Sequence, residues 1–414
     1  MVWARRTKVM QRLAQAVWTG ALVMGIFAGE ARGDVASDQA AAILVFPKIL
    51  VDTTLPPKTK RGPVDTLIRV SNTSDKPISI SCFYINANGH CSNAPTTICD
   101  PYDKSAPCGQ TGICDAGWHE TDFIVTLSPR QPIAWLASVG AAPCDSSPPG
   151  LPCFPFKVSD QLNRIQPVSE DPFVGELKCI ATNVDGVPVD RNDLKGEAEI
   201  IRSSSAPDLL DVEAYNAIGI PAIKGTNDGD PKLVLGGGVC VGGSRDGSSC
   251  AAAASCPGGR CSAEYSGCPN ILVLDHFFDG AIDPVSAKEV TTTLTLVPCS
   301  EDFESQAQVP IIVQVLVFNE FEQRFSTSTS VTCFRDIKLT DIDNSTPDRS
   351  LFSAAFMGTL TGQSRLRGVV GPNGRYGYTL LGVAEEFRKG GGTAAFNLHF
   401  NGSRPDSDYV YLPH

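Results

Sequence analysis

The stretch DTLIRVSNTS, residues 65–74, alternates apolar and polar side chains and ends in a run of turn-forming residues. Successive side chains of a β-strand point to opposite faces, so Ile68 and Val70 are expected to face one core. The stretch TTTLTLVPCS, residues 291–300, has the same pattern, with Leu294 and Leu296 in the corresponding places. The two stretches predict one kind of strand that occurs twice in the chain.

Short alternating runs of this kind recur from residue 43 to the end, while helical periodicity is scarce after residue 33. The 30 prolines and 38 glycines of the chain interrupt these runs and favour turns between them. Many short strands separated by turns are typical of antiparallel sandwiches. The predicted fold class is all-β, with two related antiparallel β-sandwich (Ig-like) domains that carry disulfide-rich loop inserts.

Four blocks recur in the same order, which indicates an internal duplication. The paired blocks are 43–52 with 271–280, 65–74 with 291–300, 126–140 with 359–371, and 173–200 with 376–396. The predicted organisation follows from these blocks: a signal peptide over 1–33, a β-sandwich domain over 34–205 with a Cys-rich insert at 91–114, a linker with a second Cys-rich insert over 206–270, and a second sandwich over 271–414.

Residues 1–33 have the composition of an export signal. Four basic residues, Arg5, Arg6, Lys8 and Arg12, precede the apolar run AVWTGALVMGIFAG, and small residues follow it. This run is shorter than the ~20 apolar residues that span a bilayer, which favours a cleaved signal over a membrane anchor. We expect no transmembrane segment after signal removal, and a location in the periplasm, on the outer cell surface or outside the cell.

The charge of the chain bears on its partners. With 45 acidic and 34 basic residues, the formal net charge is -11. Nucleic acids and anionic lipids are themselves negative, so they are disfavoured as partners. We expect a protein or glycan partner at the cell envelope and no nucleic acid.

Fifteen cysteines in an exported chain predict disulfides, because such compartments oxidise thiols. The expected pairs are Cys82 with Cys179 as an inter-sheet bridge, Cys299 with Cys333, and Cys144 with Cys153. Two clusters remain, Cys91, Cys99, Cys108, Cys114 and Cys240, Cys250, Cys256, Cys261. Cys268 is left over, as a free thiol, an intermolecular link, or a sign that one of these pairings is wrong.

The second cluster lies in CVGGSRDGSSCAAAASCPGGRC, residues 240–261. Structural zinc sites normally pair their cysteines closely, and only Cys256 and Cys261 approach that spacing. CPGGRC also has one residue too many for a thioredoxin-like redox pair. A disulfide-stapled loop module is therefore expected, with neither a metal nor a redox centre.

Three motifs resemble those of uncharacterised bacterial exported proteins with Ig-like β-sandwich repeats and short Cys-rich inserts. They are Ser71–Ser74 at a strand end, Cys82–Tyr84, and Phe173–Cys179 before a Gly-rich hairpin. The resemblance covers most of the first domain and is weaker in the second, where Leu381 or Gly382 stands near the expected cysteine. It implies a secreted Ig-like sandwich and carries over no catalytic residue.

Two groups of residues are the candidates for chemistry. WHETD, residues 118–122, sets His119 beside Glu120 and Asp122 but lacks the second histidine of a zinc protease motif. The second group is Asp275, His276, Asp279 and Asp283, for which an edge or loop histidine is the preferred interpretation. No nucleophile elbow, Walker loop or dinucleotide motif is present in the sequence. We therefore predict no catalytic, cofactor-binding or metal-binding residues.

Two oxygen-rich loops are candidates for structural calcium, with plain turns as the preferred alternative. Their acidic and amide residues are Asp228, Asp230, Asp341, Asp343, Asn344 and Asp348. Neither loop follows the EF-hand pattern, since Phe352 stands where that loop requires glutamate.

The leading functional prediction is an exported, non-enzymatic structural or interaction protein of the cell surface or periplasm. It would act in adhesion or in envelope or matrix assembly, through loops at the sandwich ends. The alternative is a carbohydrate-active hydrolase or a glycan-binding protein on the same scaffold. A hydrolase would need a cleft that unites His119, Glu120 and Asp122 with another acid.

Overall fold

The computed structural model describes residues 35–54, 63–102, 108–144, 149–150, 153–154, 164–203, 210–250, 253–369, 378–403 and 407–413. The predicted signal peptide lies outside these residues. In the described part, strands dominate and the α-helix α2 (Ala354–Met357) is a single turn. The predicted all-β class is confirmed.

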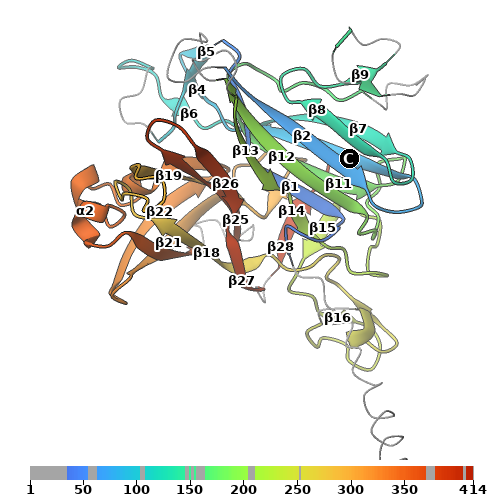
Figure 1. Ribbon diagram of the computed structural model, residues 1–414. Helices are drawn as coiled ribbons and strands as arrows, with labels where there is room; N and C mark the ends of the chain where they lie inside the picture. Colours follow the sequence, from blue (N-terminus) through green and yellow to red (C-terminus); the bar gives the residue numbers. More distant parts are fainter. Residues whose placement is uncertain are drawn as a thin grey trace, which may run out of the picture. The chain divides into compact units, whose positions relative to one another are not determined.

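The first sandwich consists of two antiparallel sheets (Figure 1). Sheet 1 has the order β14-β1-β11-β3-β7 and sheet 2 the order β13-β12-β2-β8. The strands are β1 (Ile43–Val51), β2 (Val64–Asn72), β3 (Ile78–Asn86), β7 (His119–Leu127), β8 (Pro132–Leu136), β11 (Phe173–Thr182), β12 (Leu194–Ser203), β13 (Leu210–Asn216) and β14 (Ile218–Ile220). The last two lie in the stretch predicted as linker, because β13 returns along β12 and β14 then pairs with β1.

The second sandwich has the same construction. Sheet 3 has the order β22-β21-β24-β18-β27 and sheet 4 the order β23-β19-β25-β26. The strands are β18 (Pro269–Phe277), β19 (Val290–Pro298), β21 (Pro310–Asn319), β22 (Arg324–Thr332), β23 (Arg335–Lys338), β24 (Thr361–Val369), β25 (Leu380–Arg388), β26 (Thr393–Asn397) and β27 (His399–Ser403).

Strand order is identical in the two sandwiches when the nine strands of each are matched along the chain. Two of the block pairs noted in the sequence fall on matching strands, β1 with β18 and β2 with β19. The third block pair aligns β8 with β24, and the fourth aligns β11 with β25. In both cases the two aligned strands occupy different positions in their sheets. Alternating strands resemble one another whatever their position, so similarity alone misplaced these two pairs.

Sheets 1 and 4 face each other across a shared interior. β3 is buried along its whole length, and β1 is buried except at one residue, so sheet 1 is covered on both faces. The core around Ile68 and Val70 includes Leu381 and Val383 of β25. Sheet 2 instead alternates, as its strand β2 shows, and exposes its outer face. Burial of Ile68 and Val70, and of Leu294 and Leu296 in the second sandwich, confirms the predicted inward faces.

A further, three-stranded sheet joins the linker to two segments of the second half of the chain. β28 (Asp408–Tyr411) pairs antiparallel with β15 (Lys232–Leu235) and parallel with β20 (Glu301–Asp302). The linker is therefore part of the folded body rather than a free connection.

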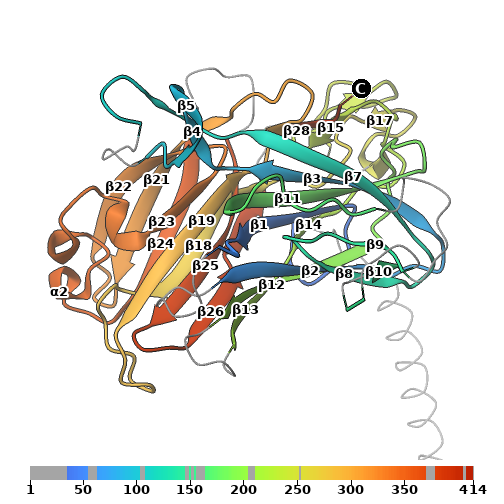
Figure 2. The ribbon, with the colours of Figure 1, turned by 90° about the horizontal axis from the view of Figure 1, so that it is seen from above.

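The first Cys-rich insert also contacts both sandwiches. Its strands β4 (Gly89–Cys91), β5 (Ala94–Cys99) and β6 (Cys114–Asp115) follow β3, and Figure 2 labels the first two of them. The hydroxyl of Tyr102 accepts a hydrogen bond from the backbone N–H of Thr332 at 2.7 Å and donates one to the Phe334 carbonyl at 3.1 Å. The Arg335 guanidinium lies 3.8 Å from the centre of the Tyr102 ring. This insert thus fastens the first sandwich to the second.

The described residues contain seven disulfides. Two predicted pairs are confirmed, Cys82 with Cys179 and Cys144 with Cys153. The first is not an inter-sheet bridge, however, because β3 and β11 are neighbours in sheet 1 and their register sets the two cysteines directly opposite, with Cα atoms 4.1 Å apart.

The predicted pair of Cys299 with Cys333 is wrong. Cys299 bonds to Cys268, since the end of the linker runs beside the end of β19 and brings the two Cα atoms to 6.4 Å. Cys333 is a buried free thiol. Of the three explanations offered for Cys268, the third therefore holds: one of the expected pairings was wrong, and Cys333 is the cysteine without a disulfide partner.

Each Cys-rich cluster forms two crossed disulfides. The bonds are Cys91–Cys108, Cys99–Cys114, Cys240–Cys256 and Cys250–Cys261. The second pair closes the module around β16 (Cys240–Val241) and β17 (Arg260–Cys261). Three sulfurs in each module lie close enough to share a metal ion, but all of them are consumed by disulfides. Both clusters are covalent staples.

Candidate functional site

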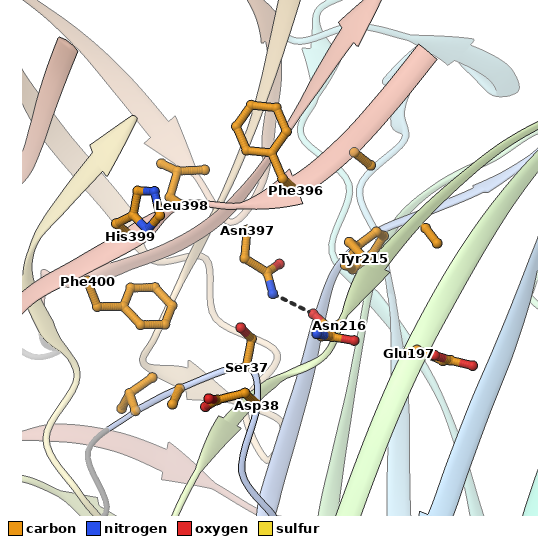
Figure 3. A pocket seen from close by; sticks show the side chains of 14 residues that line it. Ser37, Asp38, Glu197, Tyr215, Asn216, Phe396, Asn397, Leu398, His399 and Phe400 are labelled. Atoms are coloured by element: carbon orange, nitrogen blue, oxygen red, sulfur yellow. Dashed lines mark hydrogen bonds between the residues drawn. The ribbon is translucent and has the colours of Figure 1, made fainter. Parts of the chain in front are cut away.

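A groove runs along the junction of the two sandwiches, where the edge strands β13 and β26 lie side by side (Figure 3). Its volume is about 520 Å³, within the usual range for ligand sites. The lining side chains include Ser37, Asp38, Glu197, Tyr215, Asn216, Phe396, Asn397, His399 and Phe400. The Asn397 side chain crosses the junction and donates a hydrogen bond to the Asn216 carbonyl at 2.7 Å.

The groove continues across sheet 2. A neighbouring hollow of about 580 Å³ shares Ser37, Asp38, Glu197 and Asn216 with the first and extends to Arg69 and Lys195. Lys195 Nζ donates to the Asp38 carbonyl at 2.7 Å, which holds the chain segment at residues 35–39 beside the strands. The two hollows adjoin through these shared residues, and we call them together the junction groove.

Charges in the junction groove are fixed by neighbouring strands. Arg69 on β2 forms ion pairs with Glu197 and Glu199 on β12, at 2.8 Å in the case of Glu197. Glu197 keeps 46% of its side chain exposed, so its carboxylate remains accessible to a ligand. The groove thus presents a carboxylate of fixed position beside the amide of Asn216.

Apolar surface lies at one end of the groove. Phe396 and Phe400 are partly buried and line it, and Figure 3 shows their rings on either side of Asn397. Carboxylates and amides bind hydroxyl groups, while an aromatic face packs against an apolar one. A sugar ring has both kinds of surface. The geometry therefore suits an extended saccharide better than a compact apolar ligand.

The structure does not bring the residues of WHETD together into one site. His119 to Leu127 form β7, in which successive side chains face opposite ways. Glu120 and Asp122 share one face, and His119 lies on the other and is exposed. The three side chains that the hydrolase alternative required therefore do not face a common cleft.

Glu120 itself has an unusual environment. Burial raises the pKa of its carboxyl to about 7, with a further contribution from the charge of Asp122. Its Oε2 atom is buried without a hydrogen-bond partner among the described residues. This carboxyl therefore holds a proton in the folded protein at pH values where the unfolded chain has lost it.

We expect Glu120→Gln to raise the melting temperature near pH 8 and to have little effect below about pH 4.5. The folded pKa lies above the ordinary value, so the stability associated with this proton is complete at low pH and is lost as pH rises towards 7. Thermal unfolding across this range measures the difference. The exposed Glu322→Gln is the control and should show no pH-dependent change. A melting temperature lowered equally at every pH would contradict the prediction.

His276 is a core residue and not the edge or loop histidine expected from the sequence. It lies on β18 with 4% of its surface exposed, because the strand turns this side chain inward. Nε2 accepts a hydrogen bond from Ser364 at 2.8 Å, and Nδ1 donates to the Phe277 carbonyl at 2.9 Å. Burial lowers the pKa of His276 to about 4, so the ring is neutral at physiological pH.

The carboxylates near His276 in sequence serve local structure. Asp279 accepts hydrogen bonds from the backbone N–H of Thr292 and from Thr340. Asp283 pairs with Arg388 at 2.9 Å. The oxygen-rich loops behave similarly: Asp228 pairs with Arg260, and Asp343 accepts hydrogen bonds from backbone N–H groups. These groups stabilise turns and strand ends.

Sequence reasoning missed a set of buried charges between sheet 1 and the strands of sheet 4 and of the small sheet that contains β20. Lys48 on β1 pairs with Glu385 on β25 and, at 2.9 Å, with Asp336 on β23. Lys178 on β11 pairs with Glu301 on β20. The available signals were a lysine inside the otherwise apolar strand ILVFPKILV, and a glutamate and a lysine two residues apart inside FVGELKCIAT.

Searches of protein-family models and of curated proteins found no match to this chain. Among the described residues, no helix is long and apolar enough to cross a membrane.

Proposed function

We propose that this chain is an exported, non-enzymatic binding protein of the cell envelope and that the junction groove holds an extended saccharide. The observation that carries the proposal is the groove itself, with Glu197, Asn216 and the rings of Phe396 and Phe400 lining it. Binding through such a groove suits adhesion or matrix assembly, where a long polymer passes across the surface.

The disulfides support the proposed compartment. Seven bonds in the described part of the chain require an oxidising environment, such as the periplasm or the exterior of the cell. The signal-like composition of residues 1–33 agrees with export. Identical strand order in the two sandwiches likewise supports a duplicated ancestral unit, and the groove lies where the two sandwiches meet.

The test is binding of the mature protein to an array of immobilised oligosaccharides, followed by titration calorimetry with the best ligand. Phe400→Ala and Glu197→Gln should each weaken binding by about tenfold, the effect expected for one well-made contact. The control is Glu289→Gln, since Glu289 is partly exposed and does not line the groove. Equal affinity of all variants would contradict the proposal.

Release of reducing ends by the wild type, lost in Glu197→Gln, would instead favour the hydrolase alternative. Asp38 and Glu197 both line the groove and would then be the candidate carboxyl pair. If none of the saccharides on the array binds, the proposal is overturned.

A further inference from the structure

Lys178 lies between the two sandwiches in a cluster without exposed surface. Its Nζ atom pairs with the Glu301 carboxylate, donates to the Pro298 carbonyl at 3.2 Å, and lies 3.5 Å from Oε1 of Glu176. All three ionisable side chains are at most 1% exposed. An amine and two carboxyl groups are thus held together away from bulk water.

The walls of this cluster are aromatic. Phe83 lies opposite Lys178 in the strand register and stacks on Phe303, with ring centres 4.2 Å apart. The indole N–H of Trp118 donates to Oε1 of Glu301 at 3.3 Å and fixes the orientation of that carboxyl group. The amine nitrogen is therefore held at one oriented carboxyl group, and such fixed proximity favours an intramolecular reaction.

The cluster has one ammonium for two carboxyl groups. Burial raises the pKa of Glu176 well above its ordinary value and raises that of Glu301 as well. Burial also opposes the charge of Lys178, although the two carboxyl groups keep its pKa raised. One carboxyl group therefore keeps its proton, and transfer of a second proton from the ammonium to the carboxylate yields a neutral amine beside a neutral acid.

The second buried lysine provides a contrast. Lys48 pairs with Glu385, which also binds Arg202 at 2.9 Å. Burial opposes the negative charge of Glu385, but Lys48 and Arg202 nevertheless hold the pKa of this carboxyl at about 2. Glu385 therefore remains a carboxylate, which an amine does not attack, and this site stays an ion pair.

We propose that Lys178 and Glu301 condense to an intramolecular amide bond. The neutral Nζ attacks Cδ of Glu301, and Glu176 accepts a proton from the nitrogen and gives a proton to the departing hydroxyl group. The C–O bond breaks, the C–N bond forms, and one water molecule leaves. The reaction needs no oxidant, cofactor or second protein.

This bond would have a structural role that the disulfides do not fill. In the described part of the chain, no disulfide joins a strand of the first sandwich to a strand of the second. An amide from β11 to β20 connects the two halves, and reducing agents do not cleave it. The inference is independent of the ligand proposed for the junction groove.

The test is the intact mass of the mature protein after reduction, alkylation and denaturation, with its N-terminus determined separately. The expected mass is about 18 Da below the mass calculated for the alkylated sequence, because one water molecule is lost. Tryptic digestion should yield one branched peptide containing both Lys178 and Glu301. A full sequence mass with the two residues in separate peptides would show an ion pair only and overturn the proposal.

Four variants test which residues take part in the condensation. Lys178→Arg keeps the charge but should abolish the mass loss, whereas Lys48→Arg should retain it. Glu301→Gln should give the same final mass as the wild type, because an amide side chain condenses with loss of ammonia. Glu176→Gln should leave a larger uncondensed fraction soon after folding. Condensation that persists in Lys178→Arg would contradict the assignment.

Discussion

Replacement of Lys48 by Met is expected to lower the free energy of unfolding by about 3 kcal/mol, the lower end of the cost of breaking a buried ion pair, because Glu385 keeps its second partner, Arg202. Lys48 Nζ contacts Glu385, whose side chain is 1% exposed, and Asp336, whose side chain is 31% exposed. Asp336 can recover water after the substitution, but Glu385 cannot. Equilibrium unfolding in guanidinium chloride under oxidising conditions measures the loss.

Two further variants test whether the loss of stability comes from the buried charge. The double variant Lys48→Met with Glu385→Gln should recover part of the stability. The substitution replaces the buried carboxylate that lost Lys48 by a neutral amide. Lys389→Met removes an exposed ion pair with Glu289 and should cause no measurable change. A double variant less stable than Lys48→Met would show that the loss comes from packing and would contradict the electrostatic explanation.

The class of the fold could be predicted because each strand carries its own evidence. In β2, Ile68 and Val70 are buried while Arg69 between them is partly exposed, and this alternation is legible in the sequence. The same pattern identified β19 and its inward face. These are local properties, set by the period of two in side-chain direction.

The neighbour of each strand could not be predicted in the same way. Sheet order depends on contacts between residues far apart in the chain, and alternating strands fit many partners equally well. For this reason Cys82 and Cys179 were correctly paired but assigned to different sheets. Cys268 and Cys299 were missed because their proximity depends on the path of the linker, which carries no periodic signal.

The candidate site was missed for a related reason. The junction groove takes residues from the N-terminal segment, β12, β13, β26 and β27, none of which forms a recognisable motif. The buried lysines were visible as anomalies, since an unpaired lysine is too costly to bury in a strand core. Their partners, Glu301 and Glu385, lie more than a hundred residues away in the chain.

The double variant Cys82→Ala with Cys179→Ala is expected to lower the free energy of unfolding by about 4–5 kcal/mol, since this bridge closes a long loop in the unfolded chain. The loop spans 97 residues, whereas that of Cys144–Cys153 spans 9, so Cys144→Ala with Cys153→Ala should cost about 2 kcal/mol less. Both sulfurs of the long bridge are fully buried, and the cavity left by their removal increases the contrast. Guanidinium unfolding of the two variants beside the wild type measures both losses. Equal losses would mean that the long bridge restricts the unfolded chain no more than the short one, and would contradict the prediction.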